Sequence, residues 1–148
     1  FNNLPNIKSI KIPASVRKIE WSFWECKSLV EIEVNPANKY YTSLDGVLYS
    51  KDCKRLIAYP NNKGDEYIVP LGVEIIENCS FKDCDNLKSL ILPASIKKIG
   101  LNALYRCIGL QQVICEFSKS AVVNEGFWGD HKMGHLQWIY RGCRILYH

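Results

Sequence analysis

Seven cysteines and three histidines are the residues whose chemistry could give this chain a metal-binding or catalytic function. His131 and His135 are four residues apart, which can place two imidazoles one helical turn apart, as in many zinc sites. No third ligand stands at a diagnostic spacing and glycines flank the pair, so surface histidines explain the pattern better. Cys79 and Cys84 lack a second pair at zinc-knuckle spacing. We therefore predict no metal site.

A cysteine nucleophile would need a histidine beside an activated thiol. All three histidines lie in the C-terminal part of the chain, so Cys115 and Cys143 are the plausible partners. The sequence also has no glycine-rich loop for a phosphate and no paired-carboxylate signature. We therefore expect no catalytic residues, no enzymatic activity and no cofactor.

Composition limits the remaining classes of function. The 148 residues are 47% hydrophobic and 23% charged, which is typical of one globular domain. The 19 lysines and arginines are scattered and the net charge is only +4, whereas nucleic-acid binding needs clustered cations. No apolar run approaches the ~20 residues that span a bilayer. We expect a monomer that binds no nucleic acid and has no membrane-spanning segment.

The elements that would position any site are set by a repeat. Leu90 is preceded by Tyr67 and followed by Val113 and Leu136, each 23 residues apart. A fixed period of about 20 to 50 residues is typical of repeat arrays. Short apolar segments that end at a proline, as at Pro93, indicate strands that stack in parallel between successive repeats. The sequence therefore predicts a β-rich solenoid with a parallel sheet, short strands on the opposite side and single helical or 3-10 turns.

One repeat is longer than the others. From Val34 to its counterpart Val69 is 35 residues, which is 12 more than the period. The insert has the pattern of a β-hairpin, or of a small meander if Tyr40 to Leu44 joins it. The chain also begins inside a half-formed repeat and without Met, so we expect it to be a piece of a longer protein. We expect one domain over residues 1–148, made of units 7–28, 29–66, 67–86, 87–109 and 110–148, the last being a degenerate repeat and C-terminal cap.

Three of the cysteines share one position of the repeat. Cys26, Cys84 and Cys107 each follow the second apolar segment of their unit by seven or eight residues. Stacked units would place them above one another as small buried groups, and free cysteine is among the most buried residue types. A disulfide between Cys84 and Cys107 is the alternative, although stacked strands about 4.8 Å apart are wider than the Cβ spacing that a disulfide prefers.

The segment from Leu92 to Leu110 reads LPASIKKIGLNALYRCIGL. It resembles the pattern Ile-Pro-x-Ser-Val-x-x-Ile-Gly-x-x-Ala-Phe-x-x-Cys-x-x-Leu of BspA-like leucine-rich repeats, and the resemblance covers roughly Ile7 to Tyr147. Glu20 and Glu77 depart from the glycine found at Gly100. The resemblance implies an exported or surface-attached bacterial protein, extracellular or on the cell surface, that adheres to host proteins. It implies no enzymatic activity.

Alternation along the strands places one apolar row outside the core. If Leu90 and Leu92 point inward, Ile91 points outward, and the period places Ile68 and Ile114 beside it. A contiguous apolar patch suggests a contact site for a host or extracellular protein. The insert or neighbouring domains could instead cover this row, or it could only stabilise the sheet.

Glycan binding is a second possible function, because exposed aromatic rings stack on sugars. Trp24, Tyr49 and Tyr59 are the main candidates, and Trp21, Tyr40 and Tyr41 are further ones. The same rings could instead be packed in the core. A third possibility is a structural spacer in a modular surface protein.

Overall fold

The computed structural model describes residues 2–20, 23, 25–124, 126 and 136–141. This part of the chain contains the short strands that the repeat pattern predicts, joined by turns, and one 3-10 turn. The elements are β1 (Ser9–Ile12), β2 (Glu31–Val34), β3 (Tyr41–Leu44), β4 (Val47–Ser50), β5 (Arg55–Ala58), β6 (Glu66–Ile68), β7 (Ile75–Ile76), β8 (Ser89–Leu92), β9 (Lys98–Ile99), β10 (Gln112–Cys115), η1 (Lys119–Ala121), β11 (Val123–Asn124) and β12 (Gln137–Tyr140). Among the described residues, no helix has the length and apolar character needed to cross a bilayer.

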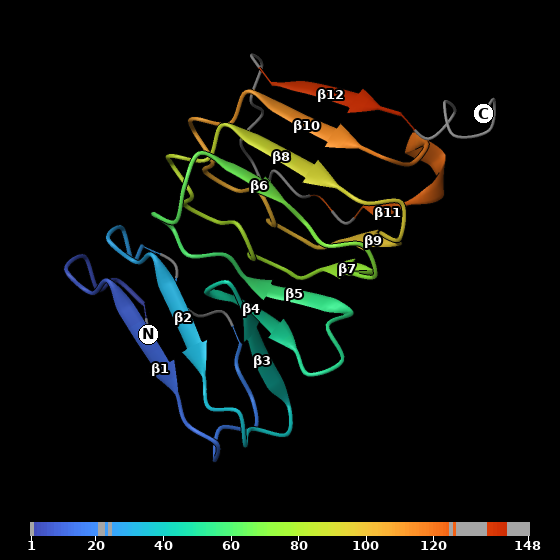
Figure 1. The fold of residues 1–148 in the computed structure, drawn as a ribbon. Coiled ribbons are helices and arrows are strands. Elements are labelled where there is room, and N and C mark those ends of the chain that lie inside the picture. Colours follow the sequence, from blue (N-terminus) through green and yellow to red (C-terminus); the bar gives the residue numbers. More distant parts are fainter. Residues whose placement is uncertain (1, 21–22, 24, 125, 127–135, 142–148) are drawn as a thin grey trace.

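The main parallel sheet has the strand order β12-β10-β8-β6 (Figure 1). Tyr67, Leu90 and Val113 are partners in successive strands, which confirms the 23-residue period. Val113, however, pairs with Trp138, so the prediction of Leu136 as its partner is wrong. The fold is confirmed as a solenoid with parallel sheets and almost no helix.

The last repeat is out of step because its turn is longer. Lys98 of β9 pairs with Val123 of β11, an offset of 25 residues, and Val113 pairs with Trp138 at the same offset. The two additional residues therefore lie between β10 and β11, where η1 stands. Three of the four earlier repeats have a proline at this position (Pro13, Pro70 and Pro93), and here Glu116 takes its place.

A second sheet runs along the opposite side of the coil with the order β11-β9-β7-β5-β4-β3. Its first four strands are parallel, and the insert joins them as the antiparallel pairs β5–β4 and β4–β3. The tight turn between β3 and β4 has positive φ at Asp45 (50°) and Gly46 (78°), which is the conformation that short hairpin turns need. The β4–β5 pair confirms the predicted hairpin, and β3 joins it to give the three-stranded meander that was the alternative.

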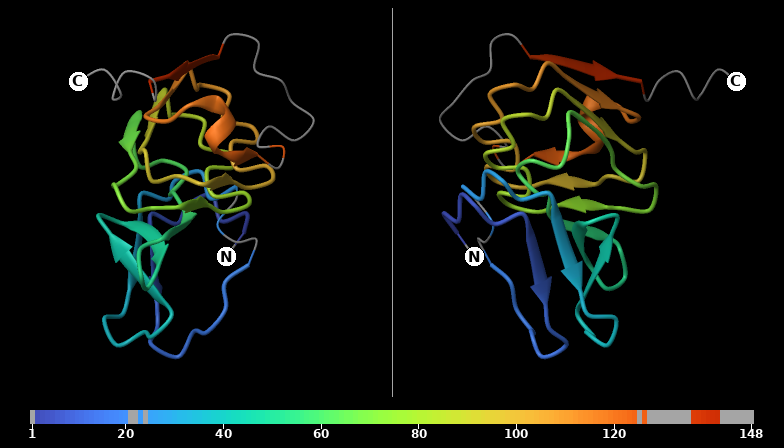
Figure 2. Two further views of the ribbon diagram at one scale, coloured as in Figure 1. Left: turned by 90° about the vertical axis from the view of Figure 1, so that its right-hand side faces the viewer. Right: turned by 60° about the vertical axis from the view of Figure 1, so that its left-hand side comes forward.

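The insert also interrupts the main sheet, which the sequence does not predict. β1 and β2 form a separate two-stranded sheet, and β6 is an edge strand that does not pair with β2. The turn of the insert lies against β2 instead, where the Ile32 amide donates to the Gly46 carbonyl at 2.8 Å. Figure 2 shows β1 and β2 set apart from the stack of β6, β8, β10 and β12. The outward row of the main sheet therefore ends at β6 and does not continue onto β2.

Strand β4 lies between two hydrophobic clusters. Leu48 packs into the N-terminal cluster with Ile10 and Ile32, whereas Val47 and Tyr49 pack into the larger cluster of the later repeats. Successive side chains point to opposite faces of a strand. Because both faces of β4 are covered, all three of its apolar residues are fully buried.

Candidate functional site

The four outward isoleucines of the main sheet form a continuous apolar row. Ile68, Ile91, Ile114 and Ile139 are partners in β6, β8, β10 and β12, and we call them the isoleucine row. Ile68 is 60% exposed, and Ile91 and Ile139 are half-buried. Ile114 is only 8% exposed, so its expected exposure is wrong. It lies between two isoleucines about 4.8 Å to either side, and these shield it.

Sequence reasoning missed the fourth member of this row. Ile139 is 25 residues after Ile114, so a strict 23-residue step points to Gln137 instead. A signal was available in the Trp138-Ile139-Tyr140 segment. Its central isoleucine stands between two inward residues, as Ile91 does between Leu90 and Leu92.

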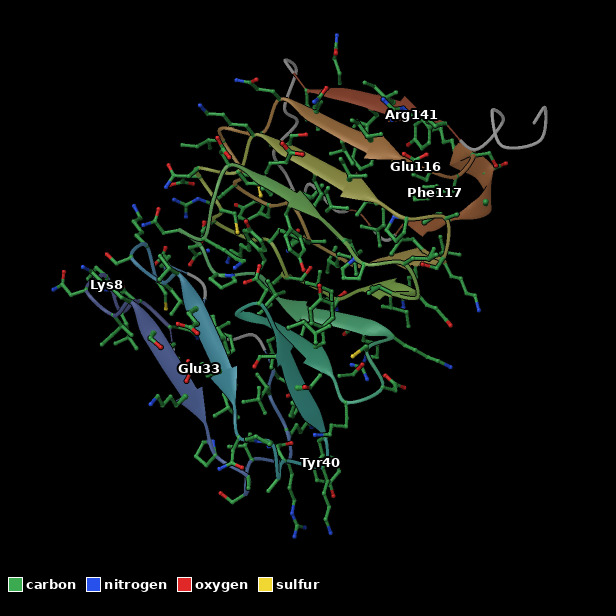
Figure 3. The ribbon with its side chains drawn as sticks, in the orientation of Figure 1. Lys8, Glu33, Tyr40, Glu116, Phe117 and Arg141 are labelled. Carbon is green, nitrogen blue, oxygen red and sulfur yellow. The ribbon has the colours of Figure 1, made fainter. Side chains whose placement is uncertain are left out.

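Polar side chains border the isoleucine row at both ends of the strands. On one side the Gln112 Nε2 donates to the Ser89 Oγ at 3.2 Å. On the other side Arg141 forms a salt bridge with Glu116 at 3.5 Å (Figure 3). An apolar centre with a polar rim is the usual anatomy of a protein contact surface.

Two of the predicted sugar-stacking residues are in the core. Tyr49 is 0% and Tyr59 is 3% exposed, so the expectation that they present rings to a glycan is wrong. The Tyr49 hydroxyl is hydrogen-bonded to the Tyr67 hydroxyl, and Tyr59 stacks on Phe81 with ring centroids 5.1 Å apart. Burial raises the pKa of both phenols. The third candidate, Trp24, lies outside the described residues.

The family model for the BspA type leucine rich repeat region, with six copies, matches residues 1–56 and 55–137. The chain belongs to this family. Leucine-rich repeats of this type are generally non-catalytic. No curated protein matches the chain.

Three solved structures share the fold of this BspA-type repeat region. The pneumococcal vaccine antigen PcpA has a TM-score of 0.74 at 24% identity, over 95% of this chain and 44% of that chain. A leucine-rich repeat protein from Eubacterium ventriosum has a TM-score of 0.64 at 22% identity, over 87% and 41%. A leucine rich cell surface protein from Faecalibacterium prausnitzii has a TM-score of 0.55 at 22% identity, over 95% and 50%. This chain therefore spans half or less of the length of these proteins.

The predicted cysteine ladder is present and contains an asparagine. Cys84 and Cys107 are fully buried free thiols, and the Cys107 Sγ donates to the Phe81 carbonyl at 2.8 Å. In the longer repeat Asn61 takes this position. Its Oδ1 accepts from the Cys26 amide at 3.0 Å and its Nδ2 donates to a carbonyl of the next unit at 2.7 Å. The ladder is a packing element that joins the N-terminal repeat to the later ones.

Among the described residues, neither the candidate nucleophile Cys115 nor the candidate ligands Cys79 and Cys84 form a catalytic or metal site. Burial raises the pKa of the Cys115 thiol to about 12, whereas a nucleophilic cysteine needs a lowered pKa. Within the described ranges, no three His, Cys, Asp or Glu side chains are arranged to hold a metal ion. The remaining candidates, His131, His135 and Cys143, lie outside those ranges.

Burial predicts the order in which the thiols react. We expect iodoacetamide to modify half-buried Cys53 in the native protein well before Cys84 and Cys107, because a buried thiol is not accessible to the reagent. Peptide mass mapping over a labelling time course measures this order. Equal labelling rates, or a disulfide-linked peptide containing Cys84 and Cys107, would contradict the buried free-thiol ladder.

Proposed function

We propose that this repeat region is a non-catalytic protein-binding module of a bacterial cell-surface or secreted protein, and that the isoleucine row is its contact surface. The observation that carries the proposal is that Ile68, which is 60% exposed, stands at the end of a continuous row of isoleucines. Exposed contiguous apolar surface with a polar rim is characteristic of interaction sites. The family, and the neighbours described as a vaccine antigen and a cell surface protein, support an extracellular or surface location.

The backbone beneath the row suits it to binding a large partner. Each isoleucine sits on a strand that is hydrogen-bonded in register with its neighbours, so the row needs little ordering on binding. Surfaces that are organised before binding lose less conformational entropy in the complex. We propose residues 1–148 as one monomeric domain, with an extracellular or host protein as the partner.

A charge placed in the row tests this proposal. We expect Ile68→Asp to weaken binding to a purified extracellular host protein at least ~10-fold, or ~1.4 kcal/mol, because the contact would then bury an unpaired carboxylate. Biolayer interferometry against a panel of such proteins measures the change.

The matched control is Val123→Asp. Val123 is 61% exposed, about as much as Ile68, but it lies in β11 on the opposite sheet. This variant should bind as the wild type does. Equal weakening by the two variants would contradict a contact at the isoleucine row, and a panel without any binder would favour the spacer function.

A further inference from the structure

A small pocket lies at the end of the molecule where β1 and β2 finish. Its volume is about 270 Å³, and the turn after β1 and the turn after β2 form its walls. Tyr40, labelled in Figure 3, lies at this end. The lining residues are Ala14, Ser15, Arg17, Ala37, Lys39 and Tyr40.

A single buried side chain fixes the two walls to each other. Asn38 is 1% exposed, and its Nδ2 donates to the carbonyls of Pro13 at 2.9 Å and Val16 at 3.0 Å in the first wall. Its Oδ1 accepts from the amides of Tyr40 at 2.8 Å and Tyr41 at 2.9 Å in the second. Both N–H donors and both Oδ1 lone pairs of this amide are used in the two turns. The pocket is therefore formed before any ligand arrives.

The charged groups at the pocket are cationic. Arg17 and Lys39 are exposed, and among the described residues neither has a salt-bridge partner. None of the six lining residues is acidic. A third cation is close, because the Lys51 Nζ donates to the carbonyl of Pro36, the residue before Ala37, at 3.2 Å. The pocket therefore favours an anionic ligand.

The second wall also carries an aromatic residue. Tyr40 is 50% exposed, whereas Tyr49 and Tyr59 are buried. The face of an aromatic ring carries partial negative charge, which attracts the C–H groups on one face of a sugar ring. The Ser15 hydroxyl can both donate to and accept from a sugar hydroxyl.

We propose that this pocket binds one carboxylated sugar residue, of the sialic acid or uronic acid type. Arg17 and Lys39 pair with the carboxylate, Tyr40 packs against the sugar ring and Ser15 bonds a hydroxyl. The volume is below the ~300–1,000 Å³ of pockets that enclose drug-sized ligands, so the site accommodates one terminal residue of a glycan. It is separate from the isoleucine row and does not depend on the proposed protein contact.

The test is a titration of the isotopically labelled chain with N-acetylneuraminic acid and with glucuronic acid, followed by amide chemical shifts. At least one of the two acids should shift the amides of 14–17 and 37–40. Neutral N-acetylglucosamine and inorganic sulfate should bind at least ~10-fold more weakly, since each lacks one of the two features recognised. Absence of binding by both acids, or equal binding of the neutral sugar or of sulfate, would overturn the proposal.

Variants locate the site. Tyr40→Ala and the double variant Arg17→Gln with Lys39→Gln should each weaken binding of the acidic sugar at least ~10-fold, whereas Tyr40→Phe keeps the ring and should bind like the wild type. Lys119→Gln removes an exposed cation at η1, which is not part of the pocket, and should leave the binding of the acidic sugar unchanged. Equal losses in Lys119→Gln and in the double variant would indicate nonspecific attraction to positive charge and overturn the assignment.

Discussion

Replacing Leu90 by alanine is expected to lower the free energy of unfolding by about 2–5 kcal/mol. Leu90 is 1% exposed and points inward from β8, between Tyr67 of β6 and Val113 of β10. Both neighbours are fixed in register by strand pairing, so the coil can close only part of the cavity that the substitution leaves. Urea unfolding followed by circular dichroism measures the change.

The matched control is Ile68→Ala in the adjacent strand. Ile68 is 60% exposed and points outward, so its truncation removes little buried surface and should cost well under half as much as Leu90→Ala. Equal losses of unfolding free energy in the two variants would contradict the assignment of Leu90 to the inward face and Ile68 to the outward face of the sheet.

The stacking of the regular repeats could be predicted because it depends only on the period. Residues one period apart pair in adjacent parallel strands, so the period alone is enough to place Tyr67, Leu90 and Val113 beside one another. The same reasoning failed at Leu136 because the turn between β10 and β11 is two residues longer. A local change of turn length shifts every later residue, and no periodicity reveals it in advance.

The burial of Tyr49 could not be predicted from alternation. Alternation assumes that one face of a strand is buried and the other is in water, and on that assumption one of Leu48 and Tyr49 should be exposed. Both residues are buried instead, because the insert packs between two hydrophobic clusters that are formed by distant parts of the sequence. The same placement brings Gly46 against β2 and breaks the main sheet.

The pocket at Tyr40 was only partly visible in the sequence. Tyr40 stood among several aromatic residues with nothing to single it out. Arg17 is one period before Tyr40, and Ala14 is one period before Ala37, so the repeat itself places these turns beside each other. What the sequence could not supply was the role of Asn38, whose four hydrogen bonds hold the two turns together.

Gly100→Ala is expected to destabilise the protein by about 1–3 kcal/mol, the range for forced overpacking in a well-packed region. Gly100 has no left-handed conformation, so the requirement for glycine comes from close approach. A Cβ here would lie 2.7 Å from the Asn78 amide nitrogen and 2.9 Å from the Glu77 carbonyl carbon. The Gly100 amide donates to the Ile76 carbonyl at 2.8 Å, so moving it away would weaken a bond between successive coils.

Gly64→Ala provides the control for this second stability prediction. A Cβ at Gly64 would meet only the Tyr59 hydroxyl at 3.8 Å, and Gly64 also lacks a left-handed conformation. Alanine there restricts the unfolded chain without straining the folded one, so stability should stay constant or rise by less than ~1 kcal/mol. Thermal and urea unfolding of both variants give the comparison. An unchanged stability of Gly100→Ala would contradict the tight contact between Gly100 and Asn78.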